Sequence, residues 1–133
     1  MRVLLEFLVH GVRYAFPAPI GAHRFGAPTA HSGPALSAHF VLSEPLVWAA
    51  PHGSIAAGVS GATIAPLLPR AAELVDRDPA LYAIVTAVDA LRVGRARERA
   101  LAERFLRDRL SPHPTVRRSR DRAAIHRAAH AGA

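Results

Sequence analysis

One segment in the last third of the chain constrains the fold more than any other. Between residues 80 and 92, apolar residues recur at the three- and four-residue spacing of one helix face: Leu81, Ile84, Val85, Val88 and Leu91. Asp78 precedes the segment as a helix N-cap, and Pro79 takes the first helical position, where its missing N–H has no partner to lose. The pattern predicts a helix over residues 79–92 with an apolar stripe that must be covered.

Weaker signals predict the other elements. Apolar spacing predicts a helix over residues 2–14, and further helices are expected over residues 70–76 and 95–110. The apolar runs LVWA and SIAAGV flank the turn residues APHG and predict a small β-hairpin. Residues 17–34 are rich in proline and glycine and are predicted to form an irregular loop.

These elements together predict a mainly α fold with a small β-hairpin, which belongs to the α+β class. The length suits one domain, and we expect a single compact module over residues 1–110. Residues 111–133 have little apolar content, so we expect a disordered basic tail there.

The predicted helix over residues 79–92 raises a conflict where it meets the arginines that follow. A straight helix continuing through Gly94 would place Arg92, Arg95 and Arg99 on the same side as the apolar stripe. Burying unpaired guanidinium groups is very unfavourable. Either the chain turns at Gly94 and a second helix presents its own apolar residues to the core, or the helix runs beyond the core and its arginines face a partner.

Positive charge is concentrated at the C-terminal end of the chain. The net charge of +7 divides into −1 for residues 1–91, +4 for residues 92–110 and +4 for residues 111–133. Acids at helical spacing, such as Glu103 before Arg107, balance part of this charge and favour an ordinary solvated helix. The candidates for contact with phosphate, nucleic acid or an acidic partner are Arg92, Arg95, Arg97 and Arg99 in the helical segment and Arg117, Arg118, Arg120 and Arg122 in the tail.

A helix, a glycine turn and a second helix are also the ingredients of a helix-turn-helix DNA-binding motif. The match is only half, because Arg95 and Glu103 stand where the second helix needs inward apolar residues.

No catalytic or metal-binding motif stands out. Cysteine is absent, and His126 and His130, four residues apart, lack a convincing third metal ligand. Polar groups between Gly21 and His52 are candidates to line a small-molecule pocket. Residues 45–69 carry no formal charge, but their prolines and glycines argue against a membrane helix. We therefore expect a cytoplasmic chain with no enzyme activity, no cofactor, no metal and no membrane insertion.

Several stretches together resemble a known family. They are LLEFLVHGVRYAFPA (4–18), PTAH (28–31), VWAAPHG (47–53), ATIAPLLP (62–69) and DPALYAIVTAVDALRVGRARERALA (78–102). In them the chain resembles the C-terminal region of bacterial helix-turn-helix regulators described as MarR-like. In that family a winged-helix segment for DNA precedes the stretch that begins here at Met1, and the present sequence does not contain it. The resemblance implies an effector or dimerisation module and carries over no catalytic or ligand residues.

The expected function is therefore that of a non-enzymatic regulatory or dimerisation module. It would act by self-association or by contact with another protein, with nucleic-acid binding through the arginines as the alternative. Helices 2–14 and 79–92 are expected to supply the interface, through Leu4, Phe7, Leu8 and His10 on the first and Leu81, Ile84 and Val88 on the second.

Overall fold

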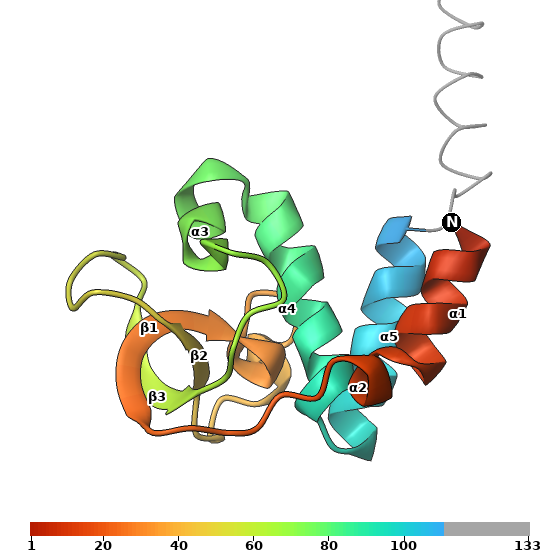
Figure 1. The fold of residues 1–133 in the computed structure, drawn as a ribbon, viewed down its shortest axis with the longest axis horizontal. Helices are drawn as coiled ribbons and strands as arrows, with labels where there is room; N and C mark the ends of the chain where they lie inside the picture. Colours follow the sequence, from red (N-terminus) through yellow and green to blue (C-terminus); the bar gives the residue numbers. More distant parts are fainter. Residues whose placement is uncertain (111–133) are drawn as a thin grey trace, which may run out of the picture.

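The computed structural model describes residues 1–110. The predicted basic tail, with Arg117, Arg118, Arg120 and Arg122, lies outside the described residues. A small β-barrel packs against one central helix, and further helices cover the other side of that helix (Figure 1). The mixed α+β class predicted from the sequence is confirmed.

The barrel consists of three short strands, which are β1 (His23–Thr29), β2 (Leu46–Ala49) and β3 (Val59–Thr63). β1 is antiparallel to both neighbours and divides between them, because residues 26–29 pair with β2 and residues 23–26 pair with β3. β2 and β3 are parallel, with Leu46 opposite Ala62 and Val47 opposite Thr63, and this pairing closes the barrel.

Two glycines permit the strands to approach this closely. A Cβ atom on Gly26 would lie 2.0 Å from the carbonyl oxygen of Trp48, and one on Gly61 would lie 2.4 Å from the carbonyl oxygen of Pro45. Neither oxygen belongs to a flexible side chain that could move away. Gly26 therefore lets β1 pass from one partner strand to the other.

The helices are α1 (Arg2–His10), α2 (Val12–Ala15), α3 (Leu74–Arg77), α4 (Pro79–Val93) and α5 (Ala96–Leu110). α4 begins as predicted, because the Asp78 carboxylate accepts the backbone N–H of Leu81 at 3.1 Å and Pro79 is the first helical residue. It ends at Gly94, whose extended backbone (φ −74°, ψ 159°) turns the chain so that α5 packs back on α4. Of the two alternatives at Gly94, the structure has the turn.

α4 is the centre of the molecule and is buried around most of its circumference. Every residue from Val85 to Arg92 is buried, between the barrel and its adjoining turn on one side and α2 and α5 on others (Figure 1). The stripe predicted from the sequence is thus only part of the buried surface. Leu81, at the start of the helix, is 37% exposed.

Several predicted elements are wrong or incomplete. LVWA forms β2 as predicted, but β2 and β3 are parallel neighbours rather than the arms of a hairpin, and only the end of SIAAGV is a strand. The predicted loop over residues 17–34 contains β1, the strand that joins the other two. The helix over residues 2–14 is interrupted at Gly11, which caps α1 before α2 begins. Residues 70–76 form a 3-10 turn, Ala71–Glu73, followed by α3.

Candidate functional site

A buried polar cluster joins the barrel to α4. The Asp89 carboxylate, which is 0% exposed, accepts hydrogen bonds from the Thr29 hydroxyl on β1 at 2.6 Å and from the Trp48 indole Nε1 on β2 at 2.7 Å. Its other oxygen accepts from Arg92 Nη1 at 2.7 Å, one turn further along α4. We call these four residues the Asp89 cluster.

Arg92 extends the cluster to two loops. Its Nε donates to the carbonyl oxygen of Phe16 at 2.9 Å, and Nη1 also donates to the carbonyl oxygen of Ala65 at 3.1 Å. The residue is 7% exposed, so its guanidinium is enclosed by the protein and bound within it. The prediction that Arg92 contacts phosphate is therefore wrong, because its charge is matched by Asp89 inside the fold.

Burial and hydrogen bonding act in opposite directions on Asp89. Burial raises the pKa of its carboxyl, while the Thr29 hydroxyl, the Arg92 guanidinium and the Trp48 indole act to lower it. No buried side-chain polar atom in residues 1–110 lacks a hydrogen-bond partner. A satisfied and enclosed group of this kind holds the barrel on α4, and its chemistry is that of a structural cross-link.

Tyr82, beside the cluster, provides a test of this packing by pH. Its ring lies 5.8 Å from that of Trp48, its hydroxyl donates to the Pro28 carbonyl oxygen, and burial raises the pKa of Tyr82 from 10.0 to about 12. Since the folded state favours the neutral phenol, this contribution to stability is complete below pH 10 and falls as the pH rises toward 12. The expected loss of unfolding free energy is up to about 2.7 kcal/mol.

The measurement is urea unfolding of the wild type and Tyr82→Phe at a series of alkaline pH values, where the variant should lack this part of the pH dependence. The chain has two tyrosines, so in a Tyr14→Phe background the phenolate absorbance reports Tyr82 alone. A midpoint near the ordinary value of 10.0 in that titration would contradict the burial of the hydroxyl.

The other predicted anion contacts on α5 do not form one group. Arg97 is exposed and its guanidinium lies 5.2 Å from the centre of the Phe40 ring. Arg95 is exposed, and its backbone N–H donates to the Glu98 carboxylate at 2.6 Å to begin the helix. Arg99 is half-buried, two residues from Arg97 and therefore on another face of α5. The turn at Gly94 separates these three arginines from the core, as the burial argument requires.

The predicted interface residues also fall into two groups, one buried and one exposed. Leu8 and Val88 are buried in the core, so neither can contact a partner. Leu4 and Phe7 on α1 are 45% and 41% exposed, and His10 is exposed with its ring 3.4 Å from Glu6.

Leu81 and the half-buried Ile84 lie at the α3 end of α4, whereas α1 runs beside α5 (Figure 1). The two predicted helices therefore do not present one continuous interface.

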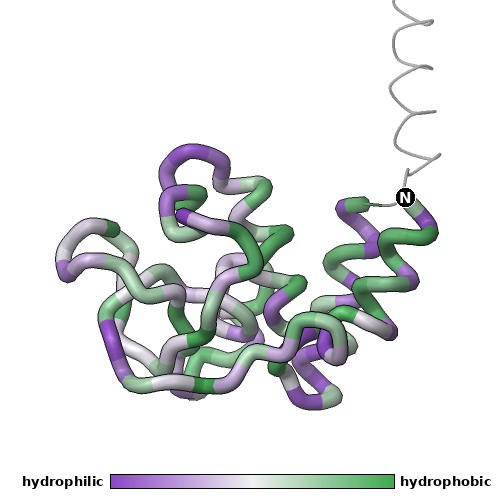
Figure 2. Tube along the Cα trace, in the orientation of Figure 1, coloured by the Kyte–Doolittle hydropathy of each residue, from purple (hydrophilic) through white to green (hydrophobic). Residues whose placement is uncertain are grey.

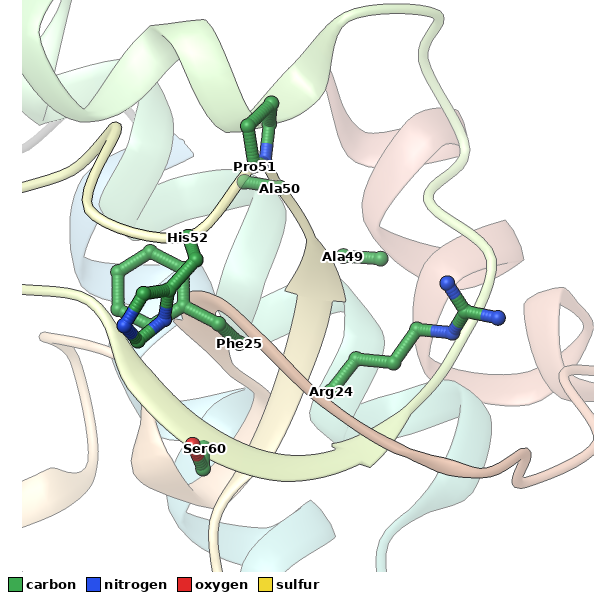
Figure 3. A pocket seen from close by; sticks show the side chains of 7 residues that line it. All are labelled: Arg24, Phe25, Ala49, Ala50, Pro51, His52 and Ser60. Carbon is green, nitrogen blue, oxygen red and sulfur yellow. The ribbon is translucent and has the colours of Figure 1, made fainter.

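A shallow pocket of about 570 Å³ lies on the barrel, where the predicted small-molecule site was expected (Figure 3). The His52 ring meets Phe25 edge to face, with centroids 5.1 Å apart. Arg24 extends away from His52, on the other side of Ala49 (Figure 3). The two basic groups therefore do not converge on one ligand atom.

The histidines within residues 1–110 do not gather into a metal site. His31 contacts the backbone of Glu44, with its Nε2 2.7 Å from the carbonyl oxygen, and no group of three metal-ligating side chains forms in this range. His126 and His130 lie outside the described residues. In the same part of the chain, no helix has the length and apolar character needed to cross a bilayer.

Sequence reasoning missed the Asp89 cluster. Asp89 is the one acid inside the apolar helix, three residues before Arg92, and this spacing was the available signal for an ion pair. Nothing local in the sequence connects Asp89 with Thr29, which is 60 residues away, or with Trp48, which is 41 residues away. Thr29 and Trp48 reach Asp89 only because the folded barrel packs on α4.

Comparisons with protein-family models, with curated proteins and with solved structures find no match for this chain.

Proposed function

We propose that this chain is a non-enzymatic regulatory module that self-associates through the outer face of α1. The observation that carries the proposal is the group of exposed apolar side chains there. Val3, Leu4 and Phe7 are 83%, 45% and 41% exposed, and the Phe7 ring meets that of Phe16, itself 50% exposed, edge to face at 6.5 Å. We call these four residues the α1 apolar face, and Figure 2 follows the apolar residues along this helix.

This face is separate from the side of α1 that packs inward. Leu5 and Leu8 are buried against the core, as α1 would require in any state of association. α1 therefore carries apolar residues on two sides, and only one of these sides packs in the core. A contiguous exposed apolar group of this kind is typical of a protein–protein contact.

The charges of α1 are compatible with pairing between two copies. At 100° per residue, Arg2 and Glu6 lie about 100° or more around the helix from Leu4 and Phe7, whereas His10 lies about 60° from Phe7. Glu6 lies toward α5, where its carboxylate is 4.0 Å from Arg107. An antiparallel pair of α1 helices related by a two-fold axis would place Leu4 of one copy against Phe7 of the other, with Arg2 and Glu6 turned away from these two residues.

The resemblance to the C-terminal region of MarR-like regulators supports a regulatory module of this type. The enclosed Asp89 cluster supports a structural rather than a catalytic role for the strongest buried charges. Together these observations favour an interaction module over an enzyme.

Light scattering coupled to size exclusion tests the proposal on the full chain. The wild type should have a mass of about twice 14.2 kDa at micromolar concentration. Leu4→Glu/Phe7→Glu should be a monomer, because burying two charges in the interface is strongly unfavourable. The dimer dissociation constant should rise at least about 100-fold.

A matched control places two glutamates on another exposed apolar pair. Val41 and Leu42 are 79% and 100% exposed, so Val41→Glu/Leu42→Glu makes the same change away from α1 and should remain a dimer. Circular dichroism verifies that both variants are folded. A monomeric wild type at these concentrations, or equal dissociation by both variants, would disprove self-association through α1.

A further inference from the structure

A groove runs between α5 and the segment before β2. It has a volume of about 210 Å³, and its lining residues are Ala35, Leu36 and His39 on one wall and Leu101, Arg104, Phe105 and Asp108 on the other. Leu101 and Phe105 are half-buried, so their side chains remain partly accessible in the groove. The groove thus combines apolar, aromatic and charged groups in a small space.

Arginine lies over an aromatic ring at both ends of this region. The Arg97 guanidinium is 5.2 Å from the centre of the Phe40 ring, and that of Arg109 is 4.7 Å from the centre of the Phe105 ring. The rings of His31 and His39 meet Phe40 at centroid distances of 5.9 and 6.5 Å. Such surfaces offer flat faces for stacking together with fixed positive charge.

The helix geometry of α5 puts Arg97 and Arg104 on the side of the helix that lines the groove, whereas Arg109 lies about 120° or more around the helix from both. Arg97, Leu101, Arg104 and Asp108 follow each other at intervals of three or four residues and therefore share a face. Arg97, Arg104 and Arg109 contribute three positive charges here against one from Asp108. After Leu110 the sequence continues with five arginines and a single acid over residues 111–133. A polyanion would therefore complement the excess positive charge of this region.

From this arrangement we infer that the groove binds single-stranded nucleic acid. Individual bases stack on the aromatic and apolar side chains of the groove, and the phosphates between them contact Arg97 and Arg104. The groove is smaller than the roughly 300–1,000 Å³ of pockets that enclose a drug-sized ligand, which suits one base rather than a whole small molecule. A duplex keeps its bases stacked inside and presents no free base to the groove.

This site is separate from the α1 apolar face. α1 approaches α5 on the flank of Glu103 and Arg107, where Arg107 pairs with Glu103 at 3.0 Å and approaches Glu6. Because the groove uses other positions of α5, the two proposals can fail independently.

Fluorescence anisotropy with labelled 12-nucleotide oligothymidylate and oligouridylate, on the full chain, tests the inference. We expect binding to both strands, with an affinity that falls as salt rises from about 50 to about 200 mM. Arg97→Gln/Arg104→Gln should weaken binding about tenfold to a hundredfold at the lower salt. It should also flatten the slope of log affinity against log salt by about 1.4, since each lost phosphate contact of a single strand contributes about 0.7.

The matched control is Arg24→Gln/Arg77→Gln, which removes the same charge from β1 and α3. It should leave the affinity and the salt slope close to those of the wild type. An abasic strand of equal length should bind at least about fivefold more weakly than oligothymidylate, because it lacks the stacking contribution of the bases.

Four outcomes would overturn the inference. They are wild-type affinity in Arg97→Gln/Arg104→Gln, equal losses in the two double variants, equal binding of the abasic strand, and tighter binding of a glutamate-rich peptide of the same charge than of the oligonucleotides. The first two would show that binding does not depend on these α5 arginines in particular. The third would remove the role of the aromatic groups, and the fourth would identify a protein site.

Discussion

Asp89→Ala should lower the free energy of unfolding by about 3–5 kcal/mol, because it leaves the guanidinium of Arg92 buried without a counter-charge. Arg92 is 7% exposed and cannot reach solvent without opening the loops that hold Phe16 and Ala65. The same substitution removes the acceptor for the Thr29 hydroxyl and the Trp48 indole. Urea unfolding followed by circular dichroism measures the change.

A double-mutant cycle separates the ion pair from the loss of packing. Asp89→Leu/Arg92→Met should be less destabilised than the sum of the two single variants, because it leaves no unpaired buried charge. The matched control is Asp76→Ala on the exposed side of α3, which should change stability by less than about 0.5 kcal/mol. Strictly additive effects in the cycle, or a loss below about 1 kcal/mol for Asp89→Ala, would contradict the role given to the cluster.

Trp48→Ala should be destabilised by about 3–5 kcal/mol, the range for removing a large aromatic side chain from a core. Trp48 is 1% exposed, contacts Tyr82 edge to face and donates to Asp89, so its removal opens a cavity between the barrel and α4. Trp48→Phe keeps an aromatic ring but lacks the indole N–H, and it should lose about 1–3 kcal/mol.

Tyr14→Ala is the control for Trp48, since it removes an aromatic side chain that is 78% exposed and should change stability by less than about 0.5 kcal/mol. Trp48 is the single tryptophan of the chain, so circular dichroism rather than tryptophan fluorescence must follow unfolding in these variants. Similar losses in Trp48→Ala and Tyr14→Ala would show that the barrel does not pack on α4 through Trp48.

The elements that the sequence predicted well are those whose signals are local. Asp78 and Pro79 mark the start of α4 because a cap acts within one helical turn, and the observed bond from Leu81 to Asp78 is such a contact. The turn at Gly94 followed from the incompatibility of charge and core within a few residues. Each of these two predictions depended only on residues that are close together in the sequence.

The strands were predicted poorly because their signals are not local. β1 contains Gly26 and Pro28, residues that normally indicate a loop, and it is a strand because β2 and β3 pair with its two halves. The same limit applies to the candidate site residues. Arg92 and Arg97 look alike in the sequence, yet one is enclosed with Asp89 and the other lies over Phe40 on the surface.

The sequence by itself determined the position and ends of α4, the presence of apolar residues for a core, and the concentration of arginine after residue 91. These properties depend on side-chain type and on spacing within a few residues. Only the tertiary structure decided which arginine is buried, which face of α1 is left exposed and which aromatic rings lie beside α5. Those outcomes depend on contacts between residues far apart in the chain, and such contacts exist only once the barrel has closed on α4.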